Sequence, residues 1–150
     1  MPVRTCYSGF GIKMICGSYE LGRLPDNLSV MTQNELKQRT KIFALDIIRM
    51  VKSLPYCMSG AVISKQVVRS ATSIGANYRS ACRSKSDRDF LNKMVIVEEE
   101  VDESVYWLEL LTESGIAPDE KTISLKQEAS ELTAIFTASG QTIRRRLNDR

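Results

Sequence analysis

The chain has 150 residues, enough for one domain with its own core, and its 43% hydrophobic and 26% charged residues are typical of a soluble globular protein. It has no histidine, and Cys6, Cys16, Cys57 and Cys82 form no Cys-x-x-Cys pair, which excludes the usual zinc fingers and histidine-based catalysis. No apolar run approaches the ~20 residues that span a bilayer. We therefore expect a cytoplasmic protein with reduced thiols and no membrane segment. The net charge of +3 is too small to indicate a nucleic-acid partner by itself.

The first 30 residues differ from the rest of the chain. Glycine, serine, cysteine and proline are scattered through them without sustained periodicity, and no convincing signal-peptide core is present. We expect residues 1–30 to be a leader that is poorly ordered or non-native, and residues 31–150 to form the folded domain. The alternative for this segment is an arm that binds a partner.

The first predicted helix runs from about Thr32 to Ser53. Thr32 and Glu35 have the spacing of a capping box, in which each side chain accepts a hydrogen bond from a backbone N–H that the helix leaves unpaired. Pro55 disfavours helical geometry at the residue before it and ends the helix. A short loop then leads to a second helix from about Ser59 to Cys82, in which Gly75 is expected to allow close approach of a neighbouring helix.

The third predicted helix runs from about Asp87 to Glu113 and begins at the cap Ser86-x-x-Asp89. Gly115 ends it, Pro118 opens the next turn, and the fourth helix runs from about Asp119 to Leu147. Short links favour antiparallel neighbours, so the prediction is an all-α fold, an up-down-up-down antiparallel four-helix bundle. The predicted core positions are Leu36, Phe43, Ile47, Met50, Val51, Leu54, Ile63, Val67, Ala71, Ile74, Tyr78, Phe90, Met94, Val97, Val101, Leu108, Leu111, Leu125, Ala129, Leu132, Phe136, Ile143 and Leu147.

The third helix carries a second apolar flank formed by Ile96, Trp107 and Leu110. One interpretation is that a neighbouring helix of the same bundle covers this flank. The other is that the flank is an interface between subunits, where tryptophan and tyrosine are enriched. Both interpretations stay open at this point.

The second helix and the link after it carry a basic stripe, with six Lys or Arg and one acid between residues 59 and 88. Residues 89–113 hold eight acids and one lysine. Three interpretations compete: solvated faces with weak ion pairs, complementarity between the two helices within or between subunits, and phosphate binding by the stripe, assisted by Arg144, Arg145 and Arg146. The candidate nucleic-acid-binding residues are Lys65, Arg69, Arg79, Arg83, Lys85 and Arg88.

The acidic cluster of the third helix does not predict a metal site. Metal-binding bundles use Glu-x-x-His pairs, and this chain has no histidine. Glu100 and Glu103 flank the core and are better suited to contacts with Arg69 or Asn77, and Asn77 is expected to make a buried polar bond that fixes the helix register. No serine or cysteine has an evident activating group, so we expect no catalytic residue and no cofactor.

Three motifs carry a family resemblance. They are Arg69-Ser70-Ala71-x-Ser73-Ile74-x-x-Asn77-Tyr78, Ser86-x-x-Asp89-Phe90 and Glu99-Glu100-x-x-Glu103-Ser104-x-x-Trp107-Leu108-Glu109-Leu110-Leu111. Over residues 32–147 the chain resembles the four-helix-bundle family of proteins encoded by intervening sequences of bacterial 23S rRNA genes. That family also includes the accessory variability determinant of diversity-generating retroelements. Many members have Asn-x-x-Glu-Gly after the second helix, where this chain has Asn77-Tyr78-Arg79-Ser80-Ala81.

The resemblance implies a homopentameric barrel without catalytic residues and, in the retroelement branch, a basic surface for nucleic acid and a reverse-transcriptase partner. Together with the basic stripe, it leads us to expect a non-enzymatic oligomer that binds RNA or DNA with little sequence specificity. The alternative is a protein-interaction module that docks a partner such as a reverse transcriptase.

Overall fold

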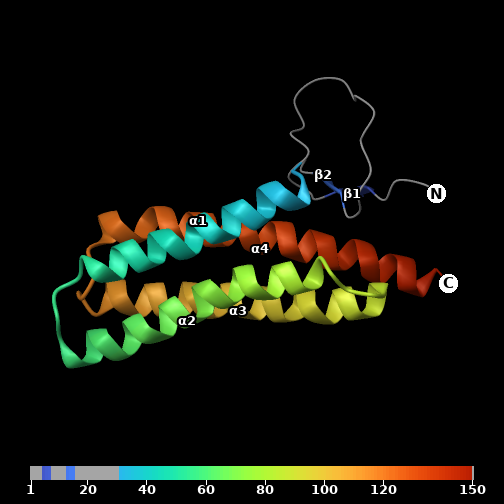
Figure 1. The fold of residues 1–150 in the computed structure, drawn as a ribbon. Helices are drawn as coiled ribbons and strands as arrows, with labels where there is room; N and C mark the ends of the chain where they lie inside the picture. The colour runs from blue at the N-terminus through green and yellow to red at the C-terminus, as the bar shows by residue number, and fades with distance from the viewer. Residues whose placement is uncertain (1–4, 8–12, 16–30, 150) are drawn as a thin grey trace, which may run out of the picture.

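Four helices make up nearly all of the structure, a computed structural model that describes residues 5–7, 13–15 and 31–149 (Figure 1). The elements are β1 (Thr5–Tyr7), β2 (Lys13–Ile15), α1 (Gln33–Lys52), α2 (Met58–Ala81), α3 (Asp87–Glu113) and α4 (Asp119–Asn148). Each helix packs against two others, in the closed order α1, α2, α3, α4. The predicted up-down-up-down antiparallel four-helix bundle is confirmed.

Local capping residues set where the helices begin. The capping box of α1 is complete: Thr32 Oγ1 accepts from Glu35 N at 3.2 Å, and Glu35 Oε2 accepts from Thr32 N at 2.6 Å. Ser86 Oγ caps α3 by accepting from Asp89 N at 3.1 Å, as predicted. The helix α2 starts one residue earlier than predicted, because Cys57 is its N-cap and the Cys57 Sγ accepts from the N–H of Gly60 at 3.3 Å.

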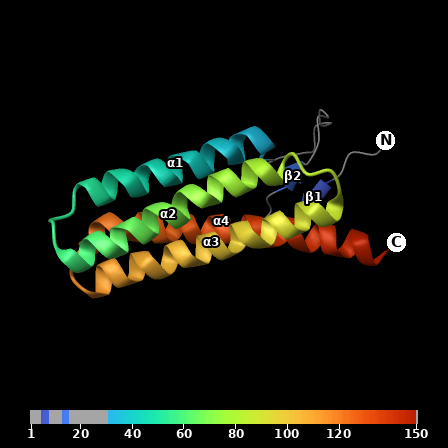
Figure 2. The same ribbon diagram turned by 60° about the horizontal axis from the view of Figure 1, so that its bottom comes forward.

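The turns and links are short and produce the antiparallel arrangement. Gly115 has φ +73°, a conformation that favours glycine, and it ends α3 as predicted. The α2–α3 link and the C-terminal end of α4 lie at one end of the bundle, while the α1–α2 and α3–α4 links lie at the other (Figures 1 and 2). Contacts that mark the register of neighbouring helices are Thr40 with Gly75, Ser70 with Ser104, and Thr112 with Thr122.

The core is the apolar stripe that the sequence predicts, with a few additions. All predicted positions are buried except Val51, Leu54, Ile63 and Leu147, which are partly buried and pack against the core. The ring centroids of Tyr78 on α2 and Phe136 on α4 are 5.5 Å apart within the core. The further buried apolar residues are Ala81, Ala117 and Ile135.

Small polar side chains are buried between the helices at positions that the hydrophobic pattern does not reveal. Ser70 Oγ and Ser104 Oγ are 2.8 Å apart and link α2 to α3. Thr40 Oγ1 donates to the Leu36 carbonyl at 3.0 Å, which satisfies a hydroxyl that lies against Gly75. The prediction that Asn77 makes a buried polar bond that fixes the helix register is therefore wrong. Asn77 is half-buried, and the serine pair makes the buried polar contact between these helices.

The two short strands precede the bundle. β1 and β2 pair in antiparallel fashion, with Thr5 opposite Ile15, and β1 lies beside α4. The sequence-based prediction contains no strand in this segment. The expected leader over residues 1–30 otherwise falls outside the described residues, and its poor order stays a prediction.

Candidate functional site

The predicted basic stripe passes through two different environments. The register of Ser70 with Ser104 places the first half of α2 beside the second half of α3, where most carboxylates of α3 lie. Lys65 and Arg69 belong to this part of the bundle. Arg79, Arg83, Lys85 and Arg88 lie around the α2–α3 link, at the opposite end (Figure 1). The structure therefore divides the six candidate residues into two groups.

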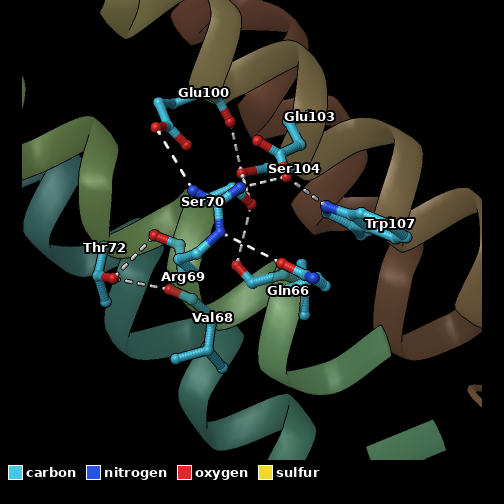
Figure 3. Close-up of polar contacts among 10 residues, drawn as sticks. Gln66, Val68, Arg69, Ser70, Thr72, Glu100, Glu103, Ser104 and Trp107 are labelled. Carbon is cyan, nitrogen blue, oxygen red and sulfur yellow. Dashed lines mark hydrogen bonds and ion pairs between the residues drawn. The ribbon is translucent and has the colours of Figure 1, made fainter. Parts of the chain in front are cut away.

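Arg69 is held in an ion-pair cluster with α3 (Figure 3). Its guanidinium Nη2 donates to the Glu103 carboxylate, and Nη1 lies 3.8 Å from Glu100 Oε1. The same Glu103 oxygen accepts the indole N–H of Trp107 at 2.9 Å, and Gln66 Oε1 accepts from Arg69 Nε at 3.2 Å. Arg69 is thus neutralised within the chain, and the expected contact of Glu100 and Glu103 with Arg69 is confirmed.

The two carboxylates of the ion-pair cluster have opposite pKa shifts. The hydrogen bond from Arg69, followed by that from Trp107, lowers the pKa of Glu103 below its ordinary value. Burial raises the pKa of Glu100, and the attraction of Arg69 only partly offsets this effect. The Glu100 side chain is 16% exposed, and its Oε2 is buried without a hydrogen-bond partner among the described residues. The contacts of Glu100 therefore do not offset the free-energy cost of burying its carboxylate, whereas the hydrogen bonds of Glu103 outweigh the cost of its burial.

Basic side chains gather at the end of the bundle that holds the α2–α3 link. We define the basic pole as residues 33–37, 79–95 and 139–149, which contain nine Lys or Arg and four Asp or Glu. The other residues of the helical region, 38–78 and 96–138, contain eight basic and twelve acidic side chains. The helical bundle is therefore electrically polarised along its length, which the small net charge of the chain conceals.

The cations of the basic pole are available to solvent. Arg79, Arg83, Lys85 and Arg88 are exposed, and none of them forms an ion pair with a carboxylate of the described residues. Arg79 Nη2 reaches only the Lys37 carbonyl oxygen, at 3.5 Å. The acid Asp89 pairs with Lys93 instead. On α4, Arg144 and Arg145 are exposed and Arg146 is half-buried.

The predicted interface residues of α3 do not form one patch. Ile96 is 42% exposed and lies eleven residues before Trp107, about 16 Å along the helix. Trp107 is partly buried against the core of its own bundle, and Leu110 is half-buried one turn beyond it. A neighbouring helix thus covers part of the flank, and the rest faces outward.

Exposed apolar side chains that the sequence-based prediction does not include lie near Trp107 and Leu110. Val62 is 61% exposed and Met58 is 83% exposed on the first turns of α2, beside the end of α3. Tyr106 is 52% exposed, with its ring centroid 4.9 Å from that of Trp107. We call Met58, Val62, Tyr106 and Leu110 the apolar patch. It lies on the outer faces of α2 and α3, away from the basic pole.

The described residues show no arrangement for metal binding or nucleophilic chemistry. Within them, no group of three or more His, Cys, Asp or Glu side chains could hold a metal ion. The Cys57 thiol caps α2, and burial raises the pKa of the Cys82 thiol, which disfavours the reactive thiolate. In the described part of the chain, no helix combines the length and the apolar character that crossing a membrane requires.

Comparison with known proteins agrees with the helical architecture. A family model described as 23S rRNA-intervening sequence protein matches residues 32–138. A crystal structure of a protein of unknown function from the S23 ribosomal protein family of Bacteroides thetaiotaomicron VPI-5482 is similar, with 35% sequence identity and a TM-score of 0.67. The similarity covers 73% of this chain and 97% of that chain.

No curated protein matches the chain. Neither the family description nor that of the solved structure names an enzymatic activity. Three arginines of the basic pole, Arg144, Arg145 and Arg146, lie beyond the residues that the family model matches. Because the model matches more than half of the chain, this protein belongs to the family of 23S rRNA-intervening sequence proteins.

Proposed function

We propose that this chain is a non-enzymatic protein that binds the phosphate backbone of nucleic acid through its basic pole. The observation that carries the proposal is the gathering of exposed cations around the α2–α3 link, without ion pairs to described carboxylates. Unneutralised Lys and Arg on rigid elements attract phosphates and release their counterions. The candidate residues Arg79, Arg83, Lys85 and Arg88 form the centre of this surface. Lys65 and Arg69 lie outside it.

The proposed binding is weakly specific for sequence. Sequence is read through hydrogen bonds and apolar contacts to base edges in a groove, whereas phosphate contacts position the protein without reading bases. The α2–α3 link contains only five residues between the helices, from Cys82 to Ser86 with the caps included, which leaves no long element for groove insertion. The exposed groups there are mainly charged ends of long side chains. Affinity is therefore expected to depend on salt far more than on sequence.

We further propose that the protein acts as a homo-oligomer, assembled through the apolar patch. Exposed Met58, Val62 and Tyr106 beside half-buried Leu110 and Trp107 have the composition of an interface core. The expected number of subunits, five, follows from the family resemblance. Each subunit would add one basic pole, so that weak individual contacts combine into higher avidity.

The test measures RNA and DNA binding at about 50 mM and 200 mM salt, for wild type and Arg79→Glu/Arg83→Glu. With four phosphate contacts, wild-type affinity should fall on the order of 100-fold between these concentrations. The variant should bind at least about tenfold more weakly at low salt, because two contacts become repulsions. Lys52→Glu/Lys65→Glu makes the same charge change at the other end of the bundle and should bind like wild type.

Two outcomes contradict the proposal. If Arg79→Glu/Arg83→Glu keeps its fold and binds as tightly as wild type, the basic pole is a solvated face. If Lys52→Glu/Lys65→Glu weakens binding equally, the whole stripe and not the pole contacts the ligand. A wild-type protein that assembles but binds no nucleic acid would favour the alternative of a module that docks a protein such as a reverse transcriptase.

A further inference from the structure

We propose that the ligand of the basic pole is double-stranded nucleic acid, bound in preference to single strands. The inference rests on the proposed function and specifies its ligand. It follows from two features of the pole: the rigidity of the elements that carry its cations, and the chemistry of the side chains that surround them.

The cations of the pole lie on packed helices or in the short link that joins two of them. Arg79 is in the last turn of α2, and Arg83 follows that helix in the link to α3. Arg88 is in the first turn of α3, and Arg144 and Arg145 are in the last turns of α4. Near these helix ends, Tyr78, Phe90 and Ile143 are buried in the same hydrophobic core. The cations therefore form an array whose backbone positions are set before any ligand binds.

A fixed array of charges suits a stiff ligand of high charge density. A duplex presents one phosphate per about 1.7 Å of its axis, and its strands are already ordered. A single strand has about half that charge density and must lose conformational freedom to follow fixed cations. On electrostatics and ordering alone, the pole should bind the duplex more tightly.

Surfaces that bind single strands usually offset the free-energy cost of ordering the strand with aromatic side chains on which the bases stack. Among the side chains that the structure describes, the aromatic residue of the pole is Phe90, which is only 9% exposed, and Tyr78 next to the pole is 1% exposed. The well-exposed tyrosines, Tyr56 and Tyr106, belong to the other part of the bundle. The pole offers point charges without a stacking platform, and this favours the duplex further.

The experiment compares a labelled oligonucleotide of about 24 nucleotides with its own duplex, as DNA and as RNA, by fluorescence anisotropy at about 50 mM salt. We expect each duplex to bind at least about tenfold more tightly than its single strand, with a steeper dependence of affinity on salt. Arg79→Glu/Arg83→Glu should weaken duplex binding, while Lys52→Glu/Lys65→Glu should not.

A second variant separates charge from stacking, since a guanidinium can stack on a base and an ammonium cannot. Arg79→Lys/Arg83→Lys keeps both charges and should retain duplex binding within about threefold. If single strands bind as tightly as duplexes, or if the lysine variant loses duplex binding, the inference is overturned while the proposed function stands. If neither form binds, the proposed function itself is wrong.

Discussion

Arg69 lies on the outer face of α2 and Arg83 follows the same helix in the link to α3, but their surroundings differ. Arg69 is 52% exposed and donates to Glu103, which also binds Trp107. Arg83 is exposed four turns later, without an ion pair to a described carboxylate. Two arginines that are equivalent in the sequence pattern therefore have different roles. One pairs with carboxylates of α3, and the other, unpaired with any described carboxylate, is a candidate for the proposed binding.

The difference arises from how acids are distributed along α3. Its second half, from Glu98 to Glu113, holds seven acids, whereas its first half has only Asp87 and Asp89. Because α2 and α3 are antiparallel, the acid-rich half faces the start of α2 and leaves the end of α2 uncompensated. Charge pairing between neighbouring helices thus depends on their register. The part of the basic stripe that lies beside few acids is the part to which we assign the proposed binding.

The largest expected effect is loss of assembly when the apolar patch, which lies away from the basic pole, is substituted. Val62→Glu/Tyr106→Glu should convert a homo-oligomer to a species of 16.9 kDa, because carboxylates would be buried in the proposed interface. Light scattering at micromolar concentration measures the mass. Both side chains are exposed, so circular dichroism should show the helical fold unchanged.

Arg79→Glu/Arg83→Glu is the matched control for assembly and should keep the mass of wild type. A wild-type mass of 16.9 kDa would rule out the oligomer. An unchanged mass for Val62→Glu/Tyr106→Glu would exclude the apolar patch as its interface. Trp107→Ala is less suitable as the test, since the indole also packs against the core of its own subunit.

An effect of intermediate size is expected when Arg69 and Arg83 are replaced one at a time. Arg83→Gln should weaken nucleic-acid binding several-fold and reduce the salt slope by about 1, with an unchanged melting temperature. Arg69→Gln should do the reverse: it should lower the melting temperature, because Glu103 and the buried Glu100 lose their cation, and leave binding unchanged. Anisotropy titrations and thermal unfolding at neutral pH measure both quantities. Equal effects of the two variants on binding would show that Arg69 also contacts the ligand.

The smallest expected effect lies within the ion-pair cluster and depends on pH. The lowered pKa of Glu103 means that the folded state binds a proton less readily than the unfolded state. Its stabilisation is therefore present above the ordinary carboxylate pKa and is lost as the pH falls through the lowered pKa. Glu100 has a raised pKa, so its ionisation destabilises the folded state as the pH rises from the ordinary value through the raised one.

Replacing each carboxylate with a neutral glutamine should consequently change the melting temperature in opposite directions. At neutral pH, Glu103→Gln should lower the melting temperature and Glu100→Gln should raise it. Both differences from wild type should shrink in acid, where the carboxyl groups are protonated. Thermal unfolding followed by circular dichroism across this pH range makes the comparison. A decrease of similar size for both variants at neutral pH would mean that Glu100 is adequately paired by Arg69.

The sequence by itself was sufficient for the helices and most of the core. Thr32, Glu35 and Ser86 act through hydrogen bonds to residues within one turn, so their spacing predicts helix starts directly. The 3.6-residue period of the apolar side chains likewise predicts which face of each helix is buried. The unpredicted cap of α2 belongs to Cys57, whose thiol is a weaker acceptor than the hydroxyl or carboxylate side chains that usually mark a helix start.

Only the tertiary structure decided which polar side chains meet across helices. Ser70 and Ser104 are 34 positions apart, and no periodic pattern distinguishes a serine buried against another helix from a serine in solvent. The same holds for Arg69, whose carboxylate partners come from α3, and for Arg83, which forms no ion pair with a carboxylate of the described residues. Ion pairs and buried hydroxyl pairs depend on distances between elements far apart in sequence. Those distances follow from how the helices pack, which local periodicity does not specify.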